Sequence, residues 1–408
     1  MPIHSSPRGV ARPFLIALFA CASLASALYA QSAPPAPPAP PVAPAPPASP
    51  ASSPAPAAPE AQARSKPQGV IRHGVTQAPA KPAGAIRVAA YNIENLFAPG
   101  AEGRMADQKS RGTMPKPDAH MKAVADAIRA VDADVLALQE IESLETLTTF
   151  RDTYLNDMGY THISSLDAGD DRGIEQSVLS RFPITQAKNW LHLPLGGTHP
   201  ANRKDSDRVA GGPIQFKRSP LLTTIQLPAL KDAPAGVPET KPQTLTLFNV
   251  HFKSGGRADG YWREREADKT AALANEFLSA DPAAAVIILG DFNARPQERA
   301  FKFISGAGFV DAFGDLPDGD PKFITHSSDR VIDHLMLSPR AAAGLIKDTR
   351  FVFGTINRPA GVDWRTTDAP DGWASDHYPV VIDLDPAKMN SWTAAAPESP
   401  AAPAGEKK

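Results

Sequence analysis

The amino-acid sequence predicts an α/β fold. Short apolar runs with strand character recur from residue 86 to residue 384, and segments with a helical period lie between some of them. Strands mixed with helices indicate an α/β domain. Several of the strand-like runs follow one another with only loops between them, so the sheets should be partly antiparallel.

Eight runs are expected to form strands, and two segments are expected to form helices. The strands are predicted at residues 86–93, 134–141, 176–184, 220–227, 245–252, 285–292, 331–338 and 377–384. The segment 120–131 places Met121, Val124 and Ile128 on one face of a helix, and the segment 264–278 does the same for its alanines and Phe277. No repeat or composition change divides this region, so residues 85–386 are predicted to form one domain.

The N-terminus has the organisation of a secretory signal. Arg8 and Arg12 precede an apolar run that ends near Leu28, and small residues follow up to Ala30. Residues 1–30 are therefore expected to be a signal peptide, and the protein to be exported to the periplasm or the extracellular space. The apolar run is too short for a comfortable membrane span, so no stable span is expected.

Both flanks of the predicted domain are rich in Pro, Ala and Ser. Residues 31–84 are expected to be a disordered, semi-rigid linker, because this composition favours extended polyproline conformations and cannot bury a core. Residues 387–408 have the same composition and are expected to be a disordered tail.

The net charge and the cysteine content exclude some classes of function for this protein. The chain has 408 residues and a formal net charge of −2, which argues against a protein that holds nucleic acid mainly by a basic surface. This balance is compatible with an enzyme that holds one phosphate briefly. Cys21 is the only cysteine and lies in the predicted signal peptide, so thiolate metal sites and cysteine nucleophiles are excluded from the mature chain.

Polar residues gather at the ends of the predicted strands. Turn chemistry explains Asn and Asp at such places, but it explains Glu and His poorly. Together these residues supply hard oxygen ligands for a divalent cation and imidazoles that titrate near neutrality, as a metal-dependent phosphoryl site requires. Zinc would need several nitrogen or sulfur ligands close together and suits the set less well. The residues are Asn92, Glu140, His251, Asp291, Asn293, Asp333, Asp376 and His377.

Six motifs in this order resemble the endonuclease/exonuclease/phosphatase superfamily, which includes deoxyribonuclease I. They are YNIENLF, LALQEIE, NVHFKSG, LGDFNARP, RVIDHLMLS and SDHYPV, and the resemblance covers about residues 86–386. YNIENLF with HFKSGG looks especially like secreted bacterial nuclease-type members. The resemblance implies a four-layer α/β sandwich, in which two packed mixed β-sheets are flanked by helices.

The resemblance also implies roles for the strand-end residues. Asn92, Glu140 and Asp376 would lie at the metal, and Asp291 with Asn293 would handle the nucleophilic water and the phosphate. His377 would lie beside the scissile phosphate and be oriented by Asp333, and His251 matches a second histidine found in some members.

Further side chains are assigned more weakly or left out of the site. Arg218 resembles a phosphate-contacting arginine, and Glu175 is a candidate to orient His251. His334 is expected to be structural, and His192, His199 and His326 are expected to be loop residues.

The predicted function is a metal-dependent phosphodiester hydrolase, in particular a secreted nuclease that cleaves DNA or RNA. Two basic stretches, residues 202–220 and 253–266, suit a nucleic-acid backbone, and no obligate protein partner is inferred. Mg²⁺ is the expected cofactor, although oxygen ligands would also suit Mn²⁺ or Ca²⁺. One alternative is a phosphatase or phospholipid phosphodiesterase of the same superfamily. Another is a non-catalytic binding module on a Pro-rich stalk.

Overall fold

The computed structural model describes residues 66–99, 114–200, 211–229, 243–256, 259–317 and 319–393. The predicted signal peptide and most of the predicted linker lie outside these residues, as do residues 202–210 of the basic stretch 202–220. Among the residues that the structure describes, no helix combines the length and apolar character needed to span a bilayer.

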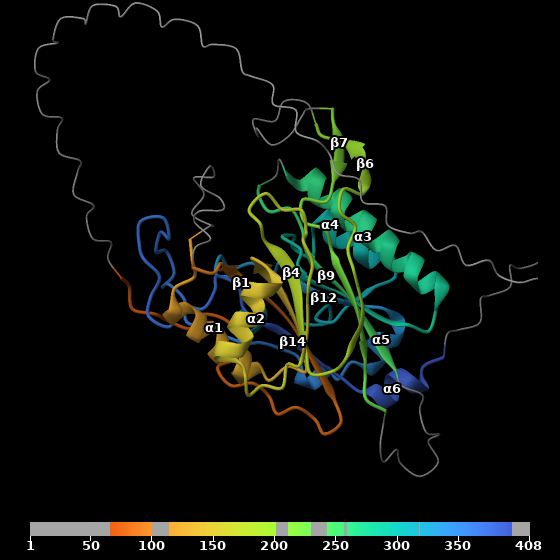
Figure 1. Ribbon diagram of the computed structural model, residues 1–408, viewed down its shortest axis with the longest axis horizontal. Helices are drawn as coiled ribbons and strands as arrows, with labels where there is room; N and C mark the ends of the chain where they lie inside the picture. Colours follow the sequence, from red (N-terminus) through yellow and green to blue (C-terminus); the bar gives the residue numbers. More distant parts are fainter. Residues whose placement is uncertain are drawn as a thin grey trace, which may run out of the picture. The chain divides into compact units, whose positions relative to one another are not determined.

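Two six-stranded sheets and a small hairpin form the framework (Figure 1). In spatial order, the first sheet contains β13 (Phe351–Val352), β14 (Val380–Leu384), β1 (Ile86–Leu96), β2 (Val135–Ile141), β4 (Glu175–Ser180) and β3 (His162–Ser165). The second contains β11 (Val310–Asp311), β12 (Asp333–Leu337), β10 (Ala285–Asp291), β9 (Thr244–His251), β8 (Leu221–Gln226) and β5 (Ile184–Lys188). The hairpin pairs β6 (Pro194–Thr198) with β7 (Pro213–Gln215).

The helices are α1 (Asp118–Val131), α2 (Leu144–Tyr154), α3 (Gly260–Ala280), α4 (Arg299–Gly306), α5 (Pro339–Gly344) and α6 (Pro386–Ser391), with short 3₁₀ turns η4 (Pro321–Phe323) and η5 (Lys347–Thr349). Each sheet has one parallel pair, β1 with β2 and β9 with β10, and the other pairings between these strands are antiparallel. A parallel pair needs a crossover connection, and here α1 and α3 supply the two crossovers.

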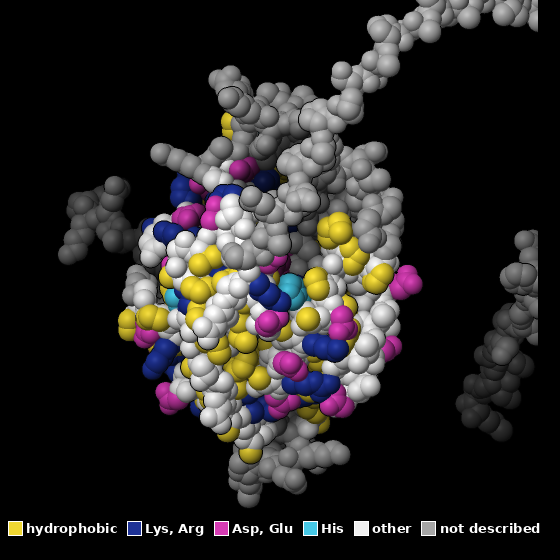
Figure 2. All heavy atoms as spheres, turned by 90° about the vertical axis from the view of Figure 1, so that its left-hand side faces the viewer, with side chains coloured by type: hydrophobic (Ala, Val, Ile, Leu, Met, Phe, Trp, Pro, Cys, Tyr) yellow, Lys and Arg dark blue, Asp and Glu magenta, His cyan; other side chains and the backbone are white. Residues whose placement is uncertain are grey.

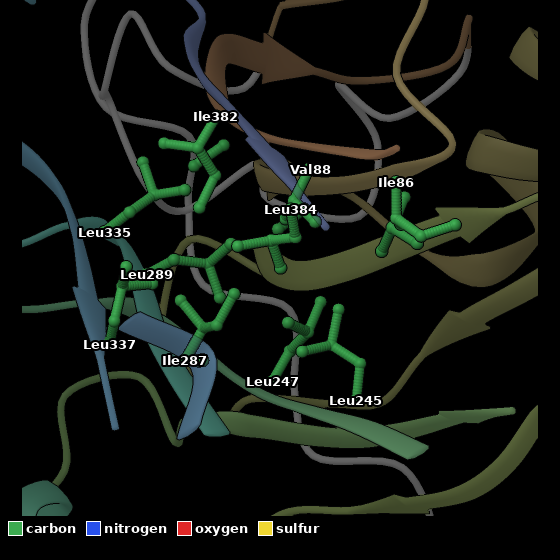
Figure 3. Close-up of a cluster of buried hydrophobic side chains, with 14 of the residues drawn as sticks. Ile86, Val88, Leu245, Leu247, Ile287, Leu289, Leu335, Leu337, Ile382 and Leu384 are labelled. Carbon is green, nitrogen blue, oxygen red and sulfur yellow. The ribbon is translucent and has the colours of Figure 1, made fainter. Parts of the chain in front are cut away.

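Alternation along the strands builds the layers. Val88 of β1 and Leu247 of β9 point into the cluster between the two sheets, which Figure 3 shows with side chains from both. The next residues, Ala89 and Phe248, point outward, toward α1 and α2 on one side and α3 and α4 on the other. Because both faces of each central strand are buried, these strands are mostly apolar. The predicted four-layer α/β sandwich is therefore confirmed.

Buried amides tie the two sheets together beneath their polar ends. Asn249 of β9 donates from Nδ2 to the carbonyls of Leu138 (3.0 Å) and Ser177 (2.9 Å), both in the other sheet. Its Oδ1 accepts from Gln139 Nε2 at 2.7 Å. These groups have no access to water, so each bond is costly to leave unmade. The contacts therefore fix how one sheet lies on the other.

The ordered domain is longer at both ends than the sequence predicts. Val70 and Val75 form isolated β-bridges with Asn357 and Phe353, and Arg72 donates to the carbonyl of Ser327 at 2.8 Å. Residues 66–84 are thus part of the domain, and their assignment to a disordered linker is wrong. The disordered tail is also predicted too early, because α6 continues to Ser391.

Gly290 is the position in β10 where a side chain cannot be accommodated. Its φ is +124°, and a Cβ atom there would lie 2.3 Å from the carbonyl oxygen of Val250. We expect Gly290→Ala to lower the free energy of unfolding by about 3 kcal/mol, because backbone strain and overpacking both oppose it. Urea denaturation would measure this change. Gly256→Ala is the control, since a Cβ there meets no atom within 4 Å. Equal losses for the two variants would contradict the expectation.

Candidate active site

Strand ends from both sheets meet at one place. Asp291, the last residue of β10, lies in register with His251 on β9 and with Asp333 on β12. From the other sheet, Asn92 of β1 donates from Nδ2 to Asp291 Oδ2 at 3.1 Å. All four side chains are almost completely buried. Residues that are 199 positions apart in the sequence, Asn92 and Asp291, are thus joined by one hydrogen bond.

Irregular backbone directs several side chains of this region. The pairing of β1 with β2 shifts between Asn92 and Leu96, and that of β2 with β4 shifts around Glu140. Glu94 (φ 54°), Glu140 (φ 67°) and Asn293 (φ 49°) all adopt the left-handed conformation. Non-glycine residues rarely do so, and such strain and bulges are concentrated at functional sites, where they re-aim side chains.

His377 and Asp333 form a buried pair beside Asp291. His377 Nδ1 lies 2.9 Å from Asp333 Oδ2, and its Nε2 lies 3.7 Å from Asp291 Oδ2. Burial alone would lower the pKa of His377, but the charges of Asp333 and Asp291 outweigh it and hold that pKa well above its usual value. Burial also raises the pKa of Asp291, against the opposing effect of His377. The imidazole is thus fixed in orientation, with Nε2 turned toward Asp291.

His251 has the opposite preference. Its Nε2 lies 3.4 Å from Asp291 Oδ2 and 3.8 Å from Glu140 Oε1, whereas its Nδ1 has no hydrogen-bond partner among the described residues. Burial, and then the charges of Arg218 and Arg172, hold the pKa of His251 well below its usual value. The site therefore contains one imidazole that favours the charged form and one that favours the neutral form. Such divergent pairs are typical of acid–base sites.

Three carboxylates surround the other side of the site. Burial and the charge of Asp376 raise the pKa of Glu94 to about 7, and Glu140 adds to this effect. Burial would raise the pKa of Asp376, but the hydrogen bond from His326 and the charge of His377 lower it. Lys116 is one of the nearby cations, and its Nζ donates to the backbone carbonyl of Glu94 at 3.0 Å.

The side chains near this place are of the chemical type that a hard divalent cation prefers. Glu94, Glu140 and Asp376 supply carboxylate oxygens, which Mg²⁺, Mn²⁺ and Ca²⁺ all accept, and a bound cation would relieve their mutual repulsion. The amide of Asn92 lies beside them, with its Oδ1 accepting from the N–H of Glu94 at 3.1 Å. Among the described residues, two groups have ligand atoms that already lie within 4.8 Å of one another: His326, Asp376 and His377, and Asp291, Asp333 and His377.

The family model described as "Endonuclease/Exonuclease/phosphatase family" matches residues 89–377, more than half of the chain. The chain belongs to this family. Its members are hydrolases that act on phosphate ester bonds and include nucleases and phosphatases, so this member of the endonuclease/exonuclease/phosphatase family is an enzyme of that class. Enzymes of the family typically use a divalent metal, in agreement with Glu94, Glu140 and Asp376, here called the carboxylate cluster.

Solved structures with a similar fold include three named proteins. The human nocturnin catalytic domain is 16% identical, covers 74% of this chain and 95% of its own, and has a TM-score of 0.46. A Bacteroides thetaiotaomicron mannosyl-6-phosphatase is 17% identical (73% and 99% covered, TM-score 0.43). Truncated Caenorhabditis elegans TDP2 is 17% identical (74% and 97% covered, TM-score 0.42). No curated protein matches the chain.

Two of the predicted site residues of this family member have other roles. The guanidinium of Arg218 points inward and donates to the carbonyls of His251 and Phe252 and to Asp170 Oδ2, so its assignment as a phosphate ligand is wrong. Its side chain is 2% exposed. Glu175 accepts a hydrogen bond from Ser165 and has no contact with His251, so its predicted orienting role is also wrong. Arg218 instead holds the backbone of His251.

The structure adds residues that the sequence did not single out. Glu94 accepts from Trp373 Nε1 at 2.6 Å, and His326 packs edge-on against His377 with ring centroids 4.5 Å apart. Arg172 reaches Glu140 Oε1 at 3.4 Å. Glu94 lies two residues after Asn92 in the first motif, which is a signal that could have found it. His334 is structural as predicted, since its Nε2 contacts the Ala294 carbonyl and its ring packs on Phe292 and Phe301.

Glu266 of α3 is a buried carboxylate that supports the site from behind. It accepts hydrogen bonds from the backbone N–H groups of Lys217 (2.8 Å) and Lys253 (2.5 Å), next to Arg218 and His251. Burial raises the pKa of Glu266 to about 7, although these two donors oppose the shift. The folded protein therefore keeps this proton up to about pH 7, whereas the unfolded chain loses it near pH 4.5.

This difference predicts how the stability of the protein depends on pH. Because the folded state binds the extra proton, the contribution of Glu266 to stability is present below about pH 4.5 and is lost as the pH rises to about 7. We expect the stability of the wild type relative to Glu266→Gln to fall by up to about 3 kcal/mol between pH 4.5 and pH 8. Urea denaturation of both proteins at the two pH values would measure this. A constant difference, or a change of opposite sign, would refute the assignment.

Proposed function

We propose that this hydrolase is a divalent metal-dependent nuclease that cleaves the phosphodiester backbone of DNA or RNA. The main observation behind the proposal is that the site has a hollow on each of two sides. A hollow of about 580 Å³ adjoins Glu94 and Asp376, and another of about 680 Å³ adjoins Asn293. Arg330 lines both. A diester within a polymer has a chain on each side of its phosphate and needs both spaces, whereas a terminal phosphate needs only one.

The charges near the site suit local contacts to a backbone. Arg72, Arg330 and Arg358 line the first hollow, and Arg263 and Arg299 join Arg330 in the second. On the face shown in Figure 2, basic and acidic side chains are interspersed rather than separated by sign. Arginines placed along a groove, without a broad basic surface, favour a substrate that is held at the site and released.

The buried residues divide the chemistry between them. Asp291 takes a proton from the attacking water, and Asn92 and Asn293 fix its Oδ2 by hydrogen bonds of 3.1 Å each. His377 donates from Nε2 to a phosphate oxygen, with Asp333 holding its Nδ1. The neutral His251 presents Nε2 to the same region, so the two histidines contact the reacting phosphate and Asp291 contacts the attacking water.

Glu94, Glu140 and Asp376 would hold the cation, with Mg²⁺ as the proposed ion. When bound, it supplies positive charge against the phosphate oxygens and the developing charge of the leaving group. Lys116 interacts electrostatically with all three carboxylates, so its positive charge reduces the net negative charge of the group.

A substrate screen with the purified protein tests the proposal. We expect hydrolysis of plasmid DNA or RNA and of bis(p-nitrophenyl) phosphate with Mg²⁺, much slower hydrolysis of p-nitrophenyl phosphate, and loss of all activity in EDTA that Mg²⁺ restores. Glu140→Gln should lose activity and need more Mg²⁺, whereas Glu145→Gln, exposed on α2, should behave as the wild type. Preference for phosphomonoesters or for phospholipids would overturn the nuclease assignment. Binding of nucleic acid without turnover would support a binding module instead.

We also propose that the enzyme is exported, on the basis of residues 1–30, which lie outside the described residues. Fractionation of the cells that make it should find the mature chain, shortened by about 30 residues, in the periplasm or the medium. A full-length cytoplasmic chain would contradict this.

A further inference from the structure

The hollow next to the carboxylate cluster has an aromatic and cationic wall. Glu94, His326 and Asp376 form its boundary with the site, and Trp364, Trp373 and Arg358 line it further out. Its volume of about 580 Å³ is within the range of small-molecule sites. A group bound here would therefore be a direct neighbour of the reacting phosphate.

Trp364 offers an indole to solvent at the rim of this hollow. It is 55% exposed. Burial of an indole ring stabilises a folded protein or a complex strongly, so an exposed ring leaves this stabilisation unused. The turn that carries it is held by Asp363, whose Oδ1 accepts from the N–H of Arg365 at 2.9 Å and whose carbonyl accepts from the N–H groups of Thr366 and Thr367. The exposed ring is thus presented by an ordered turn.

Trp373 forms a second, fixed aromatic surface. It is buried, its Nε1 donates to Glu94, and the guanidinium of Arg358 lies 4.4 Å from its ring centroid. The hydrogen bond from Trp373 to Glu94 connects the hollow directly to the carboxylate cluster.

The charges that line the hollow nearly balance. Arg72, Arg330 and Arg358 face Glu94, Asp329 and Asp376. Because its lining arginines and carboxylates offset one another, the hollow offers little net attraction to a second phosphate, whereas a flat, neutral ring can stack on its aromatic and guanidinium surfaces.

We propose that this hollow binds the nucleobase of a nucleotide adjacent to the scissile phosphate, and that the base stacks on Trp364. The inference rests on the proposed nuclease function and specifies a subsite for it. Stacking on an aromatic side chain tolerates every base, so this subsite selects nucleotides without reading their sequence.

A double-mutant cycle, in which one change removes a base from the substrate and the other removes the side chain of Trp364, tests the subsite. The full chain is assayed with Mg²⁺ on thymidylyl-thymidine and on two analogues in which a tetrahydrofuran abasic residue replaces the thymidine on one side or the other of the phosphate. For the wild type we expect kcat/KM to fall about tenfold when one of the two bases is removed. In Trp364→Ala, removal of the same base should have little further effect, and Trp364→Phe should restore part of the difference.

The controls separate the possible failures. Trp392→Ala, which follows α6 and does not line the hollow, should keep the tenfold dependence on the base. If Trp364→Ala lowers kcat/KM by the same factor for all three substrates, Trp364 does not contact a base and the subsite is refuted. If the wild type cleaves none of the three substrates or any longer nucleic acid, the proposed function itself fails.

Discussion

Asp291→Asn is expected to lower kcat/KM for a phosphodiester by about 10³-fold while the protein stays folded. The substitution keeps the shape of the side chain but removes the carboxylate that faces His251 and His377 at 3.4 and 3.7 Å. Asn92, and both the backbone N–H and Nδ2 of Asn293, donate to this carboxylate in the wild type, so the amide remains hydrogen-bonded in part. Steady-state kinetics and thermal denaturation would measure the two effects.

The control for this variant is Asp268→Asn. Asp268 lies on the surface of α3 in an ion pair with Arg265, so its neutralisation should leave kcat/KM unchanged. An Asp291→Asn enzyme with activity within tenfold of the wild type would refute the role of Asp291. A variant that does not fold would be replaced by Asp291→Ser, which leaves space for water.

The second large effect is expected for the pair of Asp333 and His377. Asp333→Asn and His377→Gln should each lower kcat/KM by about 10² to 10⁴-fold, because the imidazole needs its partner to keep its tautomer and orientation. Since the two residues act as a unit, the double variant should be no more than about threefold worse than the weaker single variant. Kinetics of all four proteins with bis(p-nitrophenyl) phosphate and Mg²⁺ would measure this.

Additive losses in the double variant would contradict a shared role. They would show that Asp333 contributes through the fold rather than through the imidazole. Thermal denaturation of the same proteins distinguishes this case. Among the described residues, the Asp333 carboxylate has His377 as its hydrogen-bond partner, and the backbone N–H of Asp333 donates to Thr325 Oγ1 at 3.1 Å independently of the side chain, so we expect little loss of stability in Asp333→Asn.

Much of the site could be predicted because its residues lie at the ends of strong apolar runs. Strand register alone brings Asp291 beside His251 and Asp333, and the type of each residue indicates its chemistry. Asn293 was expected to act together with Asp291, and the structure brings the two side chains together through a left-handed turn at Asn293.

The errors concern residues whose direction depends on distant partners. Arg218 turns inward because Asp170, 48 positions away, and two carbonyls of the neighbouring strand end accept its donors. His326 belongs to a loop without periodicity, so only the folded chain shows that it packs on His377. Residues 66–84 lack an apolar pattern of their own and are ordered by pairing with residues more than 270 positions later.

The side-chain hydrogen bonds of Asn249 have a consequence for how the enzyme can lose activity. One sheet supplies Asn92, Glu94 and Glu140, and the other supplies His251, Asp291 and Asp333, so neither half is a catalyst alone. Turnover thus depends on how the two sheets pack on each other. A small displacement at their interface would abolish activity before either sheet lost its own hydrogen bonds.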